Sequence, residues 1–371
     1  ADLWDASTDI KQNNGNILID MKIGSFTLKE GIEKIHFLLP EYDESFLPNF
    51  RKGDIVLFYE RNTPTDNATD KQVFRCNVES VDSKQLTLLL RHKQRNAKVF
   101  PMDSLYAVEH DYMDASYTNL YKGLYSFLTT NEQRKALILG QREPRINKEL
   151  HLNGNYENEQ MNRIVLQAKQ AEDYFLLTGP PGSGKTSVAL KSMVEEFISE
   201  GESDLLLLSY TNRAVDEICE MLETIQLQPQ YIRIGSSLSC DGRFESHLLQ
   251  RFGEQYGRRS EIIEALSEIH IIVGTTSAVS SKPELFCLKH FHTAIVDEAS
   301  QILEPQLLDL LCATQQTRDR KNLCAIDKFI FVGDPKQLPA VVLQENSSAV
   351  SNGNLQKIGI YDCRNSLFER L

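Results

Sequence analysis

The chain has 371 residues, enough for two or three domains that each bury a core. Its 41% hydrophobic and 25% charged residues are ordinary globular proportions, which excludes collagen-like and extensively disordered chains. The net charge of −12 argues against a protein that binds nucleic acid by bulk positive charge, although single cations can still contact phosphates.

The sequence carries no targeting or membrane signal. No apolar run approaches the roughly 18–20 residues that span a bilayer, and the first residues lack the basic and apolar regions of a signal peptide. The seven cysteines are odd in number and never spaced as CxxC, so we expect neither a disulfide framework nor a zinc site. We expect no membrane partner and a cytoplasmic location, or a nuclear one in a eukaryotic cell. A first residue other than Met is expected of a piece of a longer protein.

The first hundred residues have the period-2 alternation of β-strands. Apolar and polar residues alternate over 17–23 and again over 74–78, and two further candidate strands, mainly apolar, lie at 54–59 and 86–90. Short strands at this spacing, separated by turn residues, predict a small sheet or barrel. We assign residues 1–108 to a small β-barrel domain.

The spacing of the apolar residues changes after residue 110. Apolar and aromatic residues recur at helical spacing between 111 and 128, which predicts a helix with one packed face. Its tyrosines could stack on bases, but their helical spacing favours packing; they are Tyr112, Tyr117, Tyr121 and Tyr125. We assign residues 109–150 to a helical stalk and a linker.

From about residue 151, short apolar runs alternate with amphipathic helical patterns. The runs occupy 174–178, 205–209, 271–273, 294–296 and 329–332. Continuous apolar strands are typical of a parallel sheet that helices cover on both faces. We therefore predict an α/β domain over residues 151–371.

The segment from Gly179 to Thr186 matches the phosphate-loop pattern GxxxxGK[ST] in full, between a predicted strand and a predicted helix. Glycines let backbone N–H groups converge on a phosphate at a helix N-terminus, Lys185 can reach the outer phosphates, and the Thr186 hydroxyl can bind Mg²⁺. A glycine-rich turn that only packs is the alternative. The predicted nucleotide-binding residues here are Gly179, Pro180, Pro181, Gly182, Ser183, Gly184, Lys185, Thr186 and Ser187.

Two further polar segments follow apolar runs. Asp297 and Glu298 come after 294–296, at a strand's carboxyl end, where α/β sheets bind ligands. Asp297 can hold Mg²⁺ together with Thr186, and Glu298 can act as general base towards water. Gln337 follows a Gly-Asp-Pro turn, and its neutral amide can bond a phosphate oxygen. The predicted catalytic residues are Lys185, Asp297, Glu298 and Gln337.

Together these segments resemble the motifs of superfamily 1B helicases, the branch that includes the nonsense-mediated-decay RNA helicase and the flap-processing replication nuclease–helicase. Residues 209–216 resemble its motif Ia, 273–277 its motif Ic, 297–301 its motif II, 333–339 its motif III and 152–160 its Q motif. The resemblance covers about 150–371 and implies a RecA-like P-loop domain preceded by an accessory barrel. The forms of motifs Ia and II favour the flap-processing, DNA-directed relative.

The resemblance implies ATP and Mg²⁺ as cofactors, single-stranded nucleic acid as partner, with DNA favoured over RNA, and 5′→3′ translocation. It implies that Gln160 reads the adenine edge. The implied contacts to the nucleic-acid backbone are Thr211, Asn212, Thr276 and Ser277. In the family a second RecA-like domain follows and supplies arginines to the nucleotide. Because this chain lacks that domain, we expect it to bind ATP but hydrolyse little of it.

Three points stay open. The cations of segment 91–98 either contact nucleic acid or lie on a solvated hairpin. The protein could also belong to another enzyme class, the P-loop phosphotransferases or GTPases. The guanine-reading Asn-Lys-x-Asp tetrapeptide of GTPases does not occur, however. A nucleic-acid-binding scaffold with an idle P-loop domain is the third, although such a protein need not retain the predicted catalytic residues.

Overall fold

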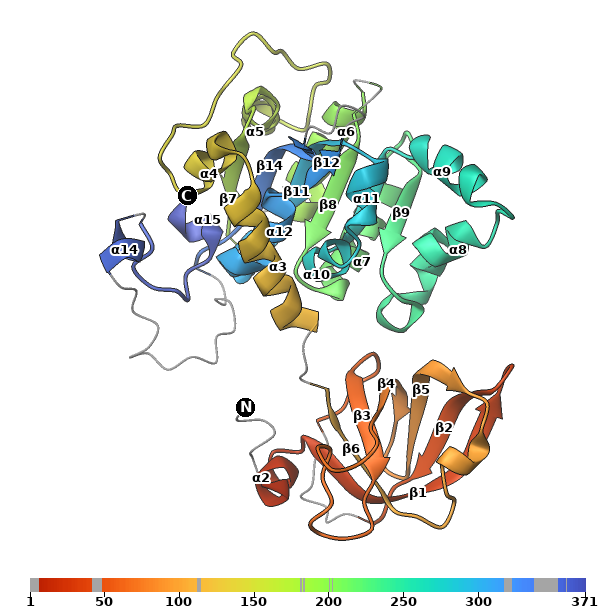
Figure 1. Cartoon of the computed structure of the whole chain (residues 1–371). Helices are drawn as coiled ribbons and strands as arrows, with labels where there is room; N and C mark the ends of the chain where they lie inside the picture. Colours follow the sequence, from red (N-terminus) through yellow and green to blue (C-terminus); the bar gives the residue numbers. More distant parts are fainter. Residues whose placement is uncertain are drawn as a thin grey trace. The chain divides into compact units, whose positions relative to one another are not determined.

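A computed structural model gives the fold of the chain. It describes residues 7–41, 49–111, 115–180, 182, 184–199, 201, 203–316, 322–336, 353–357 and 359–371. The chain divides into two compact units, residues 1–114 and 115–371, coloured along the sequence in Figure 1.

The first unit is a closed antiparallel barrel in the strand order β1-β2-β5-β4-β3-β6. Closure leaves no strand edge unpaired. Its core holds tightly packed aromatic side chains; the Phe37 and Phe58 ring centroids, for example, lie 5.4 Å apart. The predicted barrel is confirmed. Its elements are α2 (Thr8–Asn13), β1 (Ile17–Leu28), β2 (Ile32–Leu38), β3 (Ile55–Glu60), β4 (Phe74–Val81), β5 (Gln85–Gln94), the 3-10 turn η1 (Ala97–Val99) and β6 (Tyr106–His110).

The second unit is built on a six-stranded parallel sheet in the order β7-β14-β11-β8-β10-β9. The central strand β8 shows why its sequence is continuously apolar. Leu206 and Leu208 enter the core on one face of the sheet, while Leu205 and Leu207 enter the core on the other. The strands are β7 (Tyr174–Thr178), β8 (Leu205–Ser209), β9 (Tyr231–Ile234), β10 (Ile271–Thr275), β11 (Phe291–Val296) and β14 (Ile326–Gly333), with a separate hairpin of β12 (Thr314–Gln316) and β13 (Asn322–Cys324).

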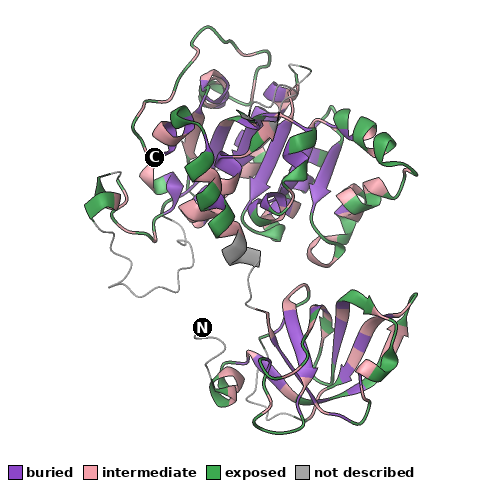
Figure 2. Ribbon diagram, viewed as in Figure 1, coloured by how far each residue is buried: buried purple, intermediate pink, exposed green. Residues whose placement is uncertain are grey.

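Helices cover both faces of this sheet, so the α/β class is confirmed. Helices α5, α6 and α7 bury their apolar stripes on one face, and α4, α11 and α12 on the other. Figure 2 shows the buried strands between helices whose outer sides are exposed. The helices are α3 (Ala115–Thr129), α4 (Glu132–Ile138), α5 (Glu159–Gln170), α6 (Lys191–Ile198), α7 (Asn212–Glu223), α8 (Leu249–Gly253), α9 (Arg259–Ser267), α10 (Thr276–Ser280), α11 (Glu284–Leu288), α12 (Glu304–Leu311), α14 (Gly353–Gln356) and α15 (Leu367–Arg370).

Short turns complete the second unit. They are the π-helical turn η2 (Lys185–Leu190) and the 3-10 turns η3 (Ser237–Ser239), η4 (Gly242–His247) and η5 (Ala299–Gln301). No helix in the described part of the chain is long and apolar enough to cross a bilayer.

Helix α3 packs through small residues, not through its tyrosines. A Cβ at Gly123 would lie 3.1 Å from the Pro305 carbonyl oxygen of α12, and the Ser126 hydroxyl donates to the Asp309 carboxylate at 3.0 Å. This close approach of two backbones turns the aromatic face outwards, since Tyr121 is 73% exposed and Tyr125 is 69% exposed. The prediction that these two tyrosines pack is therefore wrong. The side chains of Tyr112 and Tyr117 lie outside the described residues.

Candidate active site

The loop after β7 has the backbone that a phosphate loop needs. Gly182 and Gly184 have φ angles of 74° and 78°, in the left-handed region that glycine adopts without a Cβ penalty. The N–H groups of Val188 and Ala189 both donate to the Gly184 carbonyl, at 2.9 and 3.0 Å. This shared acceptor makes η2 a wide π-type turn, a feature frequent at functional sites. Pro181 and Ser183 lie outside the described residues.

Lys185 lies inside this loop. Its ammonium donates to the Gly179 carbonyl at 2.6 Å, and the side chain is buried. The bond places a positive charge over the loop backbone, where the motif requires one. Ser187, two residues further along η2, lines the cavity beside the loop.

The phosphate loop and the acidic strand meet through a direct hydrogen bond. The Thr186 hydroxyl donates to Asp297 Oδ2 at 2.7 Å, and the Glu298 N–H donates to Asp297 Oδ1 at 3.0 Å. Asp297 is 2% exposed. Burial raises the pKa of its carboxyl, although the two hydrogen bonds oppose that shift. A cation at Thr186 would therefore lie within direct or water-bridged reach of Asp297.

Glu298 has an unusual backbone. Its φ of 55° lies in the left-handed region, which costs a non-glycine residue about 1–3 kcal/mol. The Gln301 side-chain amide donates to Glu298 Oε2 at 3.0 Å and fixes the carboxylate, which lines the cavity. Backbone outliers of this kind cluster at active sites, where the surrounding structure maintains them.

Strand β14 lies between β7 and β11 and carries the third predicted segment. The Gly179 N–H donates to the Gly333 carbonyl at 3.2 Å, so the end of β14 adjoins the phosphate loop. A Cβ at Gly333 would lie 3.0 Å from the Ser300 nitrogen, so only glycine fits here without displacement. Gln337 lies four residues beyond and outside the described residues.

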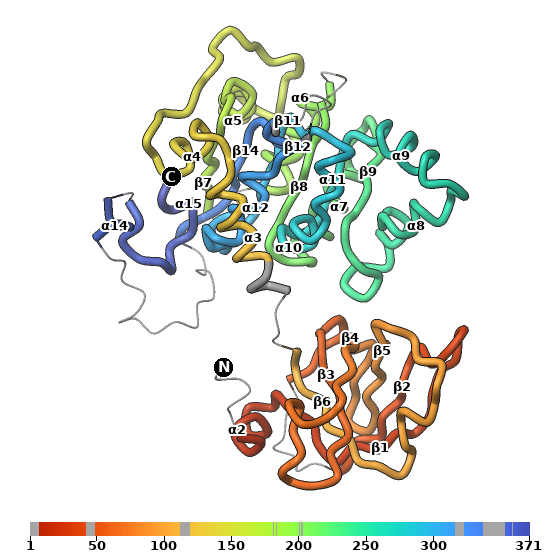
Figure 3. The backbone as a smooth tube through the Cα atoms, in the orientation of Figure 1, coloured from red at the N-terminus to blue at the C-terminus, as the bar shows by residue number. Residues whose placement is uncertain are grey.

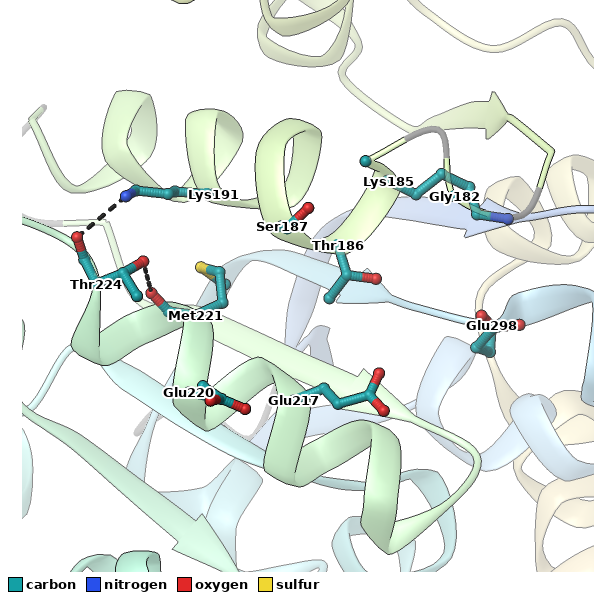
Figure 4. Close-up of a pocket in the computed structure, with 11 residues that line it drawn as sticks. Gly182, Lys185, Thr186, Ser187, Lys191, Glu217, Glu220, Met221, Thr224 and Glu298 are labelled. Atoms are coloured by element: carbon teal, nitrogen blue, oxygen red, sulfur yellow. Dashed lines mark hydrogen bonds between the residues drawn. The ribbon is translucent and has the colours of Figure 1, made fainter.

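A cavity of about 730 Å³ extends from the phosphate loop to α7. That volume is within the roughly 300–1,000 Å³ of small-molecule sites. Figure 4 shows Thr186 and Glu298 on one side and Glu217 and Glu220 of α7 on the other. The lining residues are Gly182, Gly184, Lys185, Thr186, Ser187, Lys191, Glu217, Glu220, Met221, Thr224 and Glu298. Gln160 is exposed in the first turn of α5 and does not belong to this lining, so its contact with adenine stays a prediction.

The four predicted nucleic-acid contacts lie at the carboxyl end of the parallel sheet. Strands β8 and β10 are parallel neighbours, with Ser209 paired to Thr275, so both run into their following helices at this edge. Thr211 is the N-cap of α7 and accepts the Ala214 N–H at 3.2 Å. Asn212 and Ser277 are exposed, and Thr276 is buried.

One buried acid was missed by the sequence analysis. Glu196 of α6 is completely buried, and its carboxylate accepts the N–H groups of Asn153 and Gly154, the Tyr156 hydroxyl and the Lys169 ammonium, at 2.5–3.1 Å. It ties the segment leading into α5 to the helix that continues from the phosphate loop. The only local signal for it in the sequence is an acidic residue on the apolar face of the helical pattern of α6.

Comparisons with known proteins agree with this geometry. Residues 162–343 match the family model of an AAA domain. The human DNA replication ATP-dependent helicase/nuclease DNA2 is 30% identical over 298 residues, which are 74% of this chain and 25% of that protein. The Saccharomyces cerevisiae DNA2 is 30% identical over 228 residues, 57% of this chain and 13% of that protein. The mouse RNA helicase Mov10l1 is 26% identical over 169 residues, 45% of this chain and 13% of that protein.

The chain spans about a quarter or less of the length of these relatives. The residues matched by the AAA-domain model, 162–343, include the phosphate loop and the acidic pair. The matched AAA domain, the helicase relatives and the motif set lead to one family. The chain belongs to the superfamily 1 helicases, in the branch that contains DNA2 and Mov10l1.

Proposed function

We propose that this chain is the ATP-binding part of a helicase that translocates 5′→3′ on single-stranded nucleic acid, DNA rather than RNA, in the cytoplasm or nucleus. The observation that carries the proposal is the 2.7 Å hydrogen bond between Thr186 and Asp297, which joins the phosphate loop to the acidic strand. In P-loop hydrolases a hydroxyl and a carboxylate in these positions hold the Mg²⁺ of the nucleotide.

The donors fit that metal. Mg²⁺ takes oxygen ligands, commonly one or two carboxylates besides phosphates and water, and Thr186 and Asp297 supply a hydroxyl and a carboxylate. Bound there, Mg²⁺ would neutralise charge on the outer phosphates. Lys185 exchanges the Gly179 carbonyl for a phosphate oxygen. Glu298, fixed by Gln301, accepts a proton from the attacking water. Gln337 bonds a phosphate oxygen in this proposal.

The single strand binds at the ends of β8 and β10. Thr211, Asn212, Thr276 and Ser277 offer neutral hydroxyl and amide groups, which contact a phosphate backbone without reading sequence. The preference for DNA is supported by the two DNA2 relatives, which are more similar to this chain than the RNA helicase is. The polarity rests on the family resemblance alone.

Hydrolysis by these 371 residues alone is expected to be slow. Among the described residues that line the cavity the cations are Lys185 and Lys191, and no arginine lines it. Arginine fingers contribute about 10³–10⁵ in rate. A second RecA-like domain is the expected source of such arginines in the working helicase.

Nucleotide binding and unwinding test the proposal separately. The purified chain should bind a fluorescent ATP analogue in the presence of Mg²⁺, and Lys185→Ala should abolish that binding while the circular dichroism spectrum is unchanged. In the full-length protein, Lys185→Ala should stop ATP-driven unwinding of a 5′-tailed DNA duplex. Unwinding by that variant would refute the site assignment. Single-strand binding without any nucleotide binding would instead support the idle scaffold.

A further inference from the structure

A buried carboxylate joins the helix after the phosphate loop to the segment before α5. Residues 139–158 connect α4 to α5 without forming a helix or strand, and Figure 3 shows them as a long loop. The Glu196 carboxylate of α6 accepts two backbone N–H groups of this loop, from Asn153 at 2.8 Å and from Gly154 at 3.1 Å. It also accepts the Tyr156 hydroxyl at 2.5 Å. Because such a loop lacks the backbone ladder that fixes a helix or strand, these bonds determine where its last part lies.

The cluster is closely built around the Tyr156 hydroxyl. A Cβ at Gly154 would lie 2.7 Å from the hydroxyl oxygen, so a side chain at this position would displace the hydroxyl from Glu196. The buried Lys169 ammonium, near the end of α5, donates to the same carboxylate at 2.7 Å. Buried polar networks whose members bond one another rigidify the structure around them. The carboxylate therefore fixes both α5 and the segment that leads into it.

Helix α5 begins at the edge of the sheet that carries the phosphate loop. Residues 171–173 connect the end of α5 to the start of β7, and the phosphate loop follows the end of β7. A helix of 12 residues is about 18 Å long and a strand of 5 residues about 16 Å, so the start of α5 returns to the level of the loop. Helix α5 also contacts η2. Gln160, exposed in the first turn of α5, therefore lies at this edge.

The Gln160 side chain carries the groups that read a base. A glutamine amide offers one acceptor and two donor hydrogens, and it pairs with adenine at two points, the exocyclic amine and the ring nitrogen beside it. Such a pair needs both hydrogen bonds at good length and angle, so it forms only when the backbone beneath the amide is fixed. Neither Tyr156 nor Glu196 is among the described residues that line the nucleotide cavity, so both would act through the position of this segment.

We propose that Glu196 and Tyr156 are positioning residues for the nucleotide base. They fix the segment that carries Gln160 and thereby set the affinity for adenine, without contacting the nucleotide themselves. This inference rests on the proposed function, because it takes ATP as the ligand. It goes further by assigning base selectivity to a buried cluster outside the nucleotide cavity.

Isothermal titration calorimetry with the purified chain and Mg²⁺ tests the inference. The probes are ATP and purine riboside triphosphate, which keeps the ribose and the phosphates but lacks the exocyclic amine. The original protein should prefer ATP by about 5- to 12-fold, the upper part of the range for one hydrogen bond. Tyr156→Phe keeps the ring but loses the bond to Glu196, so the preference should fall below about 2-fold while the affinity for the purine probe is unchanged.

A second variant and a matched control separate positioning from stability. Gly154→Ala displaces the same hydroxyl and should lower the preference in the same way. Tyr231→Phe is the control, because the Tyr231 hydroxyl also donates to a carboxylate, that of Glu223 at 3.3 Å, but β9 lies at the opposite edge of the sheet from β7. This control should keep the full preference for ATP.

Gln160→Ala completes the test. It should remove the preference, and adding Tyr156→Phe to it should change nothing further, because both changes act through one contact. A cluster that only stabilises the fold would lower the thermal midpoint of Tyr156→Phe and leave its preference for ATP unchanged, which would overturn the inference. Equal affinity of the original protein for both nucleotides would overturn it as well, and the proposed function would stand. Absence of binding to either nucleotide would overturn the proposed function itself.

Discussion

Replacing Glu196 by Gln should lower the free energy of unfolding of the second unit by about 3–5 kcal/mol. The carboxylate is completely buried and lies 2.7 Å from the ammonium of Lys169, whose side chain is also buried. Gln keeps the shape but removes the negative charge opposite the buried Lys169 ammonium, and the loss of this buried charge pair sets the magnitude. The new amide NH₂ would also face donors, among them the Gly154 N–H that now donates to Oε2 at 3.1 Å.

The effect of Glu196→Gln should depend on pH with a definite sign. Burial raises the pKa of Glu196, but hydrogen bonds from Lys169, Tyr156 and two backbone N–H groups outweigh burial and hold the pKa below its usual value. A carboxyl with a depressed pKa contributes stability above the unfolded-state pKa of about 4.3 and loses it as the pH falls through the folded-state value. The difference between the two proteins should therefore be largest near neutrality and shrink in acid.

Denaturant unfolding followed by far-ultraviolet circular dichroism measures this loss. In the described part of the chain the first unit has only the short helix α2, so the helical signal reports the second unit. Glu195→Gln on the same helix is the matched control and should stay within about 0.5 kcal/mol. Adding Lys169→Met to Glu196→Gln should recover much of the loss, because the pair then leaves together. A Glu196→Gln protein as stable as the original would refute the reasoning.

Of three more substitutions, one should raise the free energy of unfolding and two should lower it. Asp297→Asn should raise the free energy of unfolding by about 0.5–2 kcal/mol, because burial raises the pKa of Asp297 and makes its ionised form unfavourable. The same change should abolish Mg²⁺-dependent nucleotide binding, and calorimetry measures both effects. Gly333→Ala should destabilise by about 1–3 kcal/mol in denaturant titration, because its Cβ would lie 3.0 Å from the Ser300 nitrogen. Asp173→Asn should cost about 2–3 kcal/mol at neutral pH; burial raises the pKa of Asp173, but Arg142 and Arg145 hold it well below its usual range, so the cost should disappear in acid.

Strand prediction succeeded where burial alone determines the pattern. The run at β8 is apolar throughout because both faces of that strand are buried, and no local detail was needed to predict it. Strand β2 was not predicted because its pairing with β5 shifts register between Ile32 and Lys34. The buried residues Ile32 and Ile35 are consequently three apart, and the period-2 pattern is broken.

Site residues were predicted where a motif fixes the local backbone. They were not predicted where packing between distant segments decides how a side chain is placed. The spacing of the phosphate loop and the acidic pair predicted that Thr186 and Asp297 lie together, and they are hydrogen-bonded. Nothing local indicates that Glu196 accepts bonds from a segment some 40 residues earlier. The exposure of Tyr121 likewise follows from Gly123, which lets α12 approach the other side of α3.

One short piece of backbone joins the predicted nucleotide site to the predicted strand contacts, and we expect it to couple the two sites. The Asp297 N–H donates to the Leu208 carbonyl at 2.8 Å, and the Ser209 hydroxyl donates to the Asp297 carbonyl at 3.2 Å. Tyr210, the next residue, is exposed and directly precedes Thr211, one of the predicted strand contacts. We therefore expect a bound strand that displaces this segment to act on the backbone that holds Asp297, and nucleotide bound at Asp297 to act on the segment with the same coupling free energy. A route through α7 would need that whole helix to shift against the packed core formed by Val215, Ile218 and Leu222, which resists displacement.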